Sequence, residues 1–289
     1  YLPICEEMRK RLDAFKVDGI EDGGMIEYLT RKKKEGRFPV YQTTERPDRA
    51  AQAILEGRVV LLTDNSPEAL IFPATLNSLF QTADDYYRNE RIVTFLRLIR
   101  YVAAFLALAL PGLYVAAATF HPQLLPGNLI RSMAEARSGV PFPTAAEVLL
   151  MELSFELLRE AGLRMPGPAG NTIGIVGGLI VGQAAVSANL VSPITVTVAA
   201  LTALGSFSIP NEELSEVFRL WKYGILLLGS CFGILGVMLG CFLLLMLMAE
   251  QESYGIPWLY PYVGGNLNER ADEKDFFFKM RGRKNERLD

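Results

Sequence analysis

Three glutamates spaced four residues apart are the strongest candidates for chemistry in this sequence. Glu152, Glu156 and Glu160 share one face of a helix that the apolar pattern predicts. That helix is expected over residues 145–161, with Arg159 placed to pair with Glu156. Two interpretations stay open. The helix lies at a membrane interface with its acids in water, or the acids line a water-filled lumen in an oligomer, where they would attract cations.

A second set of polar residues lies beside an expected helix break. Pro193 lacks an amide donor and disfavours helix in the residue before it. Gln183, Ser187 and Asn189 precede this break on an otherwise apolar segment. With the three glutamates, they are our candidates for pore lining or gating.

The residue types needed for common enzyme chemistry are missing. His121 is the only histidine, which excludes a catalytic histidine pair or a multi-histidine metal site. Cys5, Cys231 and Cys241 show no metal-ligand or disulfide spacing. Neither a nucleophile elbow nor a phosphate-binding loop occurs in the sequence. We therefore expect no enzyme activity, no metal and no cofactor.

Glycine spacing indicates how the helices around these residues pack. The chain carries no charged residue over residues 165–211 or over residues 223–249. Within each segment, glycines fall close to one helix face, where small residues allow close approach in a bilayer. The predicted packing glycines are Gly170, Gly174, Gly178, Gly182, Gly229, Gly233, Gly236 and Gly240.

The fold class predicted from these patterns is a polytopic α-helical membrane protein. It should have about four to five spans plus the amphipathic glutamate helix. The expected spans are residues 101–120, 172–189, 194–209 and 223–249. A net charge of −3 argues against nucleic acid as a partner.

Arginines before the first span predict its orientation. Arg88, Arg91, Arg97 and Arg100 place the N-terminal side in the cytoplasm by the positive-inside rule. Arg97 and Arg100 are expected to reach lipid phosphates, or else to contact another subunit. A basic tail also favours a cytoplasmic C-terminus: it holds Lys279, Arg281, Arg283, Lys284 and Arg287.

Three domains are predicted along the chain. Residues 1–90 form a small cytosolic α/β domain, with strands expected over 58–63 and 68–72. Residues 91–252 form the helical transmembrane domain. Residues 253–289 hold an interfacial aromatic segment and the charged tail. Because Tyr1 is not an initiator methionine, we expect the sequence to be a fragment that lacks its true N-terminus.

One acidic segment near the first span has two interpretations. Residues 84–88 place two aspartates beside two tyrosines. We expect a surface turn with tyrosines at the membrane interface, with a metal site as the alternative.

Many short segments resemble the A subunits of bacterial spore germinant receptors, the GerA family. The resemblance is collinear from residue 10 to residue 265 and does not extend to the tail after Gly264. The matching segments are residues 44–48, 55–59, 80–81, 85–87, 98–101, 121–122, 125–126, 139–143, 151–162, 180–186, 191–193, 208–210 and 254–257.

The resemblance implies a subunit of a complex in the spore inner membrane. The resemblance implies that A subunits assemble into pentamers. These pentamers act as nutrient-gated channels for monovalent cations. Their partners are a transporter-like B subunit, which binds the nutrient, and a lipoprotein C subunit. The related stage V sporulation protein AF, an accessory germination channel, fits the same segments. The sequence also leaves open a secondary transporter, which the broken helix favours, and a non-conducting scaffold.

Overall fold

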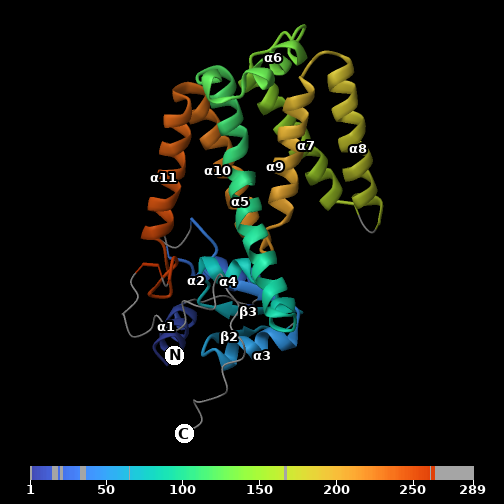
Figure 1. The fold of residues 1–289 in the computed structure, drawn as a ribbon. Coiled ribbons are helices and arrows are strands. Elements are labelled where there is room, and N and C mark those ends of the chain that lie inside the picture. Colours follow the sequence, from blue (N-terminus) through green and yellow to red (C-terminus); the bar gives the residue numbers. More distant parts are fainter. Residues whose placement is uncertain are drawn as a thin grey trace. The chain divides into compact units, whose positions relative to one another are not determined.

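The computed structural model describes most of the chain, and its elements are drawn in Figure 1. The described residues are 2–14, 19, 22–32, 37–64, 66–165, 168–260 and 262–263, without the side chains of 2–3 and 168–176. Compact unit 1 comprises residues 1–101, 209–217 and 244–289, and compact unit 2 comprises residues 102–208 and 218–243. The basic tail lies outside the described residues.

Unit 1 is built on a three-stranded antiparallel sheet. Its strands are β1 (Gln42–Thr44), β2 (Val59–Leu62) and β3 (Ala69–Phe72), in the order β1-β3-β2. All four residues of β3 are buried, as befits the central strand. The strands expected over 58–63 and 68–72 are thereby confirmed.

Three helices pack with this sheet. They are α1 (Leu2–Asp13), α2 (Gly23–Thr30) and α3 (Pro47–Leu55). The Asp22 carboxylate accepts a hydrogen bond from the Gly23 amide at 2.6 Å and so caps α2. Pro47 opens α3, where its missing amide proton costs no hydrogen bond.

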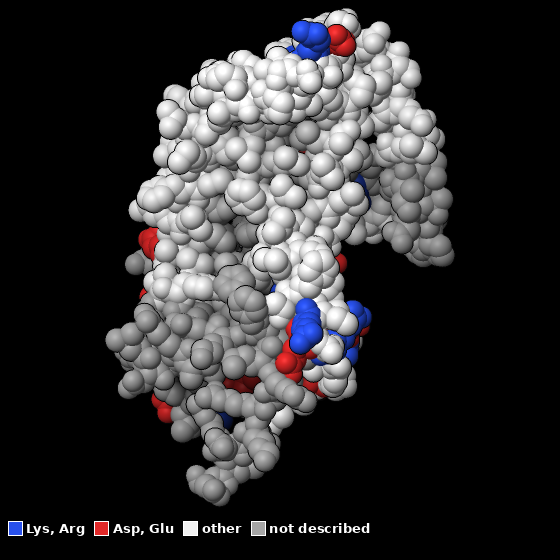
Figure 2. Space-filling view, viewed as in Figure 1, with Lys and Arg blue, Asp and Glu red and all other residues white. Residues whose placement is uncertain are grey.

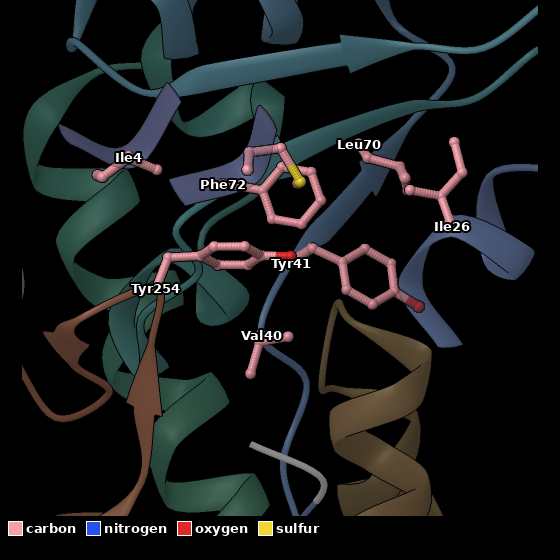
Figure 3. Packing of buried hydrophobic residues seen from close by; sticks show 8 residues of the cluster. Ile4, Ile26, Val40, Tyr41, Leu70, Phe72 and Tyr254 are labelled. Atoms are coloured by element: carbon pink, nitrogen blue, oxygen red, sulfur yellow. The ribbon is translucent and has the colours of Figure 1, made fainter. Parts of the chain in front are cut away.

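An aromatic cluster forms the core on one side of the sheet. Leu70 and Phe72 of β3 lie on the same face and contact Ile4 and Ile26 from the helices (Figure 3). Tyr254 completes the cluster, with its ring edge-on to that of Phe72 at 4.9 Å. The core of unit 1 therefore joins residues from the two ends of the chain.

The aromatic segment near residue 254 was expected at a membrane interface, and that expectation is wrong for its central residues. Strands β4 (Glu252–Ser253) and β5 (Ile256–Pro257) form a small hairpin. Trp258 is fully buried, stacks on Phe38 at 4.9 Å and donates from Nε1 to the Pro39 carbonyl at 2.8 Å. Folding onto unit 1 satisfies both the apolar ring and its polar nitrogen.

Asp85 is an internal ion-pair residue rather than part of a surface turn or metal site. It lies in the 3₁₀ helix η2 (Ala83–Tyr86), after α4 (Leu76–Phe80), and is 1% exposed. Arg100 donates to both Asp85 oxygens at 2.7 and 2.9 Å, and Arg97 Nε lies 3.5 Å away. These arginines therefore pair within unit 1 and do not reach for lipid phosphates or another subunit.

Helix α5 (Glu90–Thr119) begins in unit 1 and continues into unit 2. Within the described residues, it is the one helix long and apolar enough to cross a membrane. Its best window has a mean hydropathy of 1.9. On the face shown in Figure 2, charged side chains lie where α5 begins and where α11 ends, and the surface over the rest of both helices is almost free of them.

The rest of unit 2 is helical. Its elements are η3 (Pro122–Leu124), α6 (Gly127–Ala136), α7 (Thr144–Leu163), α8 (Pro168–Ser187), α9 (Pro193–Phe207), α10 (Glu212–Phe232) and α11 (Ile234–Glu250). Helix α7 packs against both α8 and α9. Met151, Ala185, Val191 and Ala199 form a core between these three helices.

The single span expected over residues 223–249 is wrong, because the structure divides it into two helices. Gly233 separates α10 from α11 and has a φ of 63°, a left-handed conformation that glycine adopts at low cost. A Cβ placed on Gly240 would come within 2.9 Å of Ile225 Cγ1, so the two helices lie in close contact. The glycines that suggested one packed span instead form a helical hairpin.

Candidate functional site

Helix α7 carries a row of carboxylates whose surroundings differ sharply along its length. Glu147 and Glu152 are buried, Glu156 is partly buried and Glu160 is exposed. Buried carboxylates are costly in an apolar helical unit unless partners compensate their charge. The partners of each residue therefore indicate what the row can do.

Glu152 forms an internal ion pair with Lys222 of α10. Its Oε2 accepts from Lys222 Nζ at 2.6 Å, and the two side chains are 2% and 5% exposed. The Lys222 ammonium also lies 5.0 Å from the centre of the Tyr223 ring. The Glu152 carboxylate is therefore enclosed within the single chain and is not exposed to water.

Glu156 pairs with Arg219, one helical turn before Lys222. Arg219 Nη1 lies 2.5 Å from Glu156 Oε1, and the arginine side chain is 12% exposed. The expected partner, Arg159, instead lies over the Phe207 ring and donates to Ser206 Oγ at 3.4 Å. Two residues of α10 therefore face two residues of α7, each pair with opposite charges.

Glu160 differs from its two neighbours on the row. It pairs with Arg164 on the same helix at 2.7 Å, and both side chains are more than half exposed. Exposed pairs of this kind contribute little to stability. The three glutamates share one face of α7, as predicted, but this face becomes exposed between Glu156 and Glu160.

Glu147 is a buried carboxylate on α7 that the sequence did not single out. It is fully buried, and its Oε2 accepts from the Ser192 amide at 2.9 Å and from Thr195 Oγ1 at 3.1 Å. Arg137 donates to the other oxygen at 3.1 Å. Because Ser192 is the N-cap of α9, Glu147 fixes the start of that helix to α7.

The polar residues near the helix break lie on the outside of unit 2. Gln183 and Ser187 are exposed and share a face of α8. Asn189 is also exposed and has a φ of 55°, in the left-handed region. The α8–α9 turn is therefore held from inside by Glu147 and presents its amide and hydroxyl groups outward.

Two of the predicted glycines on α8 contact neighbouring helices. A Cβ on Gly178 would lie 3.4 Å from Phe155 of α7, and one on Gly182 would lie 3.3 Å from Val196 of α9. Gly170 and Gly174 belong to the part of α8 whose packing lies outside the described residues. The described half of the glycine face thus supports close approach to both neighbours.

The other glycines serve the α10–α11 hairpin. A Cβ on Gly229 would come within 2.9 Å of Val237 Cγ2 and 3.0 Å of the Gly112 carbonyl. A Cβ on Gly236 would clash with the Leu228 carbonyl. Together with Gly233 and Gly240, these residues bring two helix backbones together near the ion pairs.

The site can hold and exchange charge, but it carries no set of metal ligands. No group of three or more histidine, cysteine, aspartate or glutamate side chains suited to a metal occurs within the described part of the chain. Two cation–carboxylate pairs and a capped helix are what the geometry offers.

Sequence reasoning found the acids but missed their partners. Arg219 and Lys222 were not singled out from the sequence, yet both pair with α7. Arg219 and Lys222 are three residues apart, and Glu152 and Glu156 are four apart, so each pair lies on one face of its helix. This spacing is the sequence feature that could have suggested the pairing. For Glu147, the nearest signal was its position before the Ser192-Pro193 break in the same apolar unit.

Comparisons with known proteins give this arrangement a context. The model of the Bacillus/Clostridium GerA spore germination protein family matches residues 3–288. The chain is 40% identical over 258 residues to spore germination protein A1 of Bacillus subtilis, covering 89% of this chain and 54% of that protein. It is 40% identical over 277 residues to spore germination protein GerLA of Bacillus cereus, covering 96% of this chain and 56% of that protein.

A further relative carries only a membrane description. The uncharacterized membrane protein YfkQ of Bacillus subtilis is 40% identical over 276 residues, covering 96% of this chain and 53% of its own length. The chain thus spans about half the length of the curated relatives it matches. No solved structure matches it significantly. A membrane location agrees with these relatives and with α5.

Proposed function

Because the chain belongs to the GerA family of spore germination proteins, we propose that it is a subunit of a pentameric ion channel in the spore inner membrane. The channel opens in response to nutrient germinants and releases monovalent cations. It works with a transporter-like B subunit and a lipoprotein C subunit, and its N-terminal domain is cytoplasmic. The single observation that carries the channel proposal is the pair of internal ion pairs between α7 and α10.

A bilayer setting for unit 2 is supported by its exposed apolar side chains. Leu227 of α10 and Leu235, Met238 and Phe242 of α11 are each more than 60% exposed. In water, so many large exposed apolar groups on neighbouring helices would promote aggregation. In lipid, they are the expected surface of a membrane helix.

The ion pairs support a mechanical role in gating. Internal charge pairs rarely increase stability over a well-packed apolar core, so their presence suggests a role in specifying position. Glu152–Lys222 and Glu156–Arg219 fix both the register and the rotation of α10 on α7. In an oligomer, a small shift of α10 would break both pairs together and give two discrete arrangements.

The candidates for pore lining follow from exposure. Gln183 and Ser187 share an open face of α8, and Glu160 lies exposed near the end of α7. These side chains are free to meet water in a ring of subunits. Glu152 and Glu156 would reach a lumen only after their pairs with α10 open.

The channel is tested by reconstituting the full chain together with its B and C subunits in liposomes and measuring potassium efflux when nutrient germinant is added. We expect efflux from the wild type, and a several-fold reduction in the variant Gln183→Leu with Ser187→Leu. Thr197→Val, an exposed polar-to-apolar change on α9, is the matched control and should retain efflux. Equal efflux from all three proteins would remove the α8 face from the pore.

The same assay separates a channel from the competing functions. Efflux that rises linearly with ion gradient indicates a channel, whereas efflux that saturates at low concentration indicates a secondary transporter. No efflux from a folded, reconstituted oligomer indicates a scaffold. A channel that conducts in the absence of any germinant and receptor partner would fit the accessory type represented by sporulation protein AF.

A further inference from the structure

In unit 1, one tyrosine hydroxyl contacts two carboxylates. The Tyr41 hydroxyl lies 2.5 Å from Glu213 Oε1 and also within hydrogen-bond distance of Glu27 Oε2. Tyr41 is 3% exposed, and both glutamates are half-buried. Glu213 lies in the first turn of α10 and Glu27 in α2.

The number of available protons limits which hydrogen bonds these three groups can form together. A neutral tyrosine has one hydroxyl proton and can donate it to only one carboxylate. If both glutamates were ionised, the second contact would place two oxygen lone pairs against each other without a proton. The two short contacts are satisfied together only when one of the carboxyl groups is protonated and donates to the tyrosine oxygen.

The surroundings select which glutamate carries that proton. Arg31, one helical turn beyond Glu27, donates to the second oxygen of Glu27, so this carboxylate already has a cation as partner. Glu213 forms no ion pair within the described residues. Burial is the largest effect and raises the pKa of Glu213, and the negative charges of Glu27 and Glu216 add to it, against opposing effects from Tyr41 and Arg31.

Other charged groups near this contact balance one another. The pocket that Tyr41 and Glu213 help to line, about 660 Å³ in volume, also holds Arg46, Arg49, Glu68, Asp84 and Glu212. Arg46 is neutralised by Asp48 and Asp84, and Arg49 donates to Tyr86 and Gln42. These arginines are therefore committed elsewhere, and the nearby Glu212 adds negative charge.

We propose that Glu213, Tyr41 and Glu27 form a proton-binding site that secures the first turn of α10 when protonated and releases it when the proton leaves. Protonated Glu213 donates to the Tyr41 oxygen, and Tyr41 donates to the Glu27 carboxylate. When Glu213 loses its proton, Tyr41 can serve only one of two negative carboxylates, which repel each other. The start of α10 then loses its contact with Tyr41 and, through it, with α2.

Glu213 lies on the same helix as the two residues that pair with α7. Helix α10 is continuous from Glu212 to Phe232, and it carries Arg219 and Lys222 two to three turns further on. A change in the order of its first turn therefore acts on the same helix that holds the ion pairs of α7. The inference itself rests on contacts within unit 1 and stands whether or not the protein conducts ions.

Infrared spectroscopy of the full chain in detergent tests the site directly. A protonated carboxyl group absorbs apart from the amide and carboxylate bands, and we expect such a band to vanish as the pH rises. Glu213→Gln should remove the band while keeping a neutral donor to Tyr41. Glu212→Gln, a change at the neighbouring residue of the same turn, is the matched control and should retain it.

Amide hydrogen exchange gives a second readout that does not depend on the band assignment. In the wild type, exchange in the first turn of α10 should accelerate on raising the pH by more than the intrinsic rate predicts. Glu213→Gln should abolish this extra acceleration, and Tyr41→Phe should accelerate exchange even at low pH. A band that survives in Glu213→Gln and disappears in Glu27→Gln would overturn the assignment, and equal exchange profiles for wild type and Glu213→Gln would overturn the switch.

Discussion

The two units give their inward-facing carboxylates different kinds of partner. In unit 2, Glu152 faces an ammonium group at 2.6 Å and Glu156 faces a guanidinium group. In unit 1, Glu213 faces only a tyrosine hydroxyl, which it shares with Glu27. A neighbouring cation keeps a carboxylate ionised, whereas a neighbouring hydroxyl can bind either the ionised or the protonated form.

Asp85 shows that the contrast comes from the partner and not from the unit. It lies in unit 1 and is as buried as Glu152, but its partners are Arg97 and Arg100. Burial raises the pKa of Asp85, but the hydrogen bonds from Arg100 and Thr82 outweigh this and lower it overall. Paired acids therefore serve as fixed structural contacts, and the Tyr41 contact serves as a titratable one.

The largest effect is expected from leaving one acid of unit 2 without its cation. Lys222→Met should destabilise the chain by about 3–5 kcal/mol, because Glu152 then stays buried without compensation. Adding Glu152→Leu should restore most of this loss by removing the charge. Thermal unfolding in detergent, followed by circular dichroism, measures both. A mild effect of the single variant would mean that Glu152 is not held in a dry interior.

Close helix packing around these pairs is tested by two glycine variants of unit 2. A Cβ on Gly205 would come within 2.6 Å of the Ala103 carbonyl, whereas one on Gly224 would meet nothing within 4 Å. Gly205→Ala should therefore cost about 1–3 kcal/mol. Gly224→Ala should be neutral or stabilise by up to about 1 kcal/mol through helix propensity. Equal melting temperatures would contradict the close approach of α9 to α5.

Stability should change with pH in opposite directions for the tyrosine-bound Glu213 and the arginine-bound Asp85. The raised pKa of Glu213 means that its contribution is present at low pH and lost as the pH rises through the folded-state pKa. The lowered pKa of Asp85 means that its contribution is present above the unfolded-state pKa and lost as the pH falls through the folded-state pKa.

Stability curves of three proteins measure this difference in sign. Glu213→Gln should flatten the alkaline side of the wild-type curve, and Asp85→Asn should flatten its acid side. At low pH, Tyr41→Phe should cost about 1 kcal/mol, the usual contribution of one hydrogen bond. If Glu213→Gln instead changed the acid side, Glu213 would be an ordinary ionised carboxylate.

The smallest effect is expected at the exposed end of the α7 row. Glu160→Gln breaks a pair with Arg164 that water already surrounds, so stability should change by less than about 0.5 kcal/mol. The same substitution at Glu156 removes a partner of the partly buried Arg219 and should cost more. Parallel melting curves compare them, and equal losses would show that exposure does not separate the two residues.

The local fold was largely predictable from the sequence. Turn residues around 64–67 predicted the β2–β3 hairpin, and the apolar period predicted α7. Asn211, a residue type common at helix starts, precedes α10, and its side chain accepts from the Leu214 amide at 2.8 Å. These features depend on neighbours within a few residues, which a sequence displays directly.

Long-range pairing was not predictable, for physical reasons. Apolar periodicity cannot distinguish a continuous span from a hairpin, because Gly233 breaks the helix without adding a polar residue. The aromatic residues near Trp258 have the composition of a membrane interface, and only the tertiary fold reveals their contact with Phe38. Likewise, Lys222 lies 70 positions from Glu152, and no local pattern links them.

Single-channel recording of the full chain with its B and C subunits in planar bilayers, in the presence of nutrient germinant, tests the central claim most directly. The ion pairs are the perturbation. The account predicts unitary cation currents from the wild type, a changed open probability in Lys222→Met, and recovery in Lys222→Met with Glu152→Leu. A folded wild-type oligomer without currents, or currents that Lys222→Met leaves unchanged, would contradict an ion channel gated through α7 and α10.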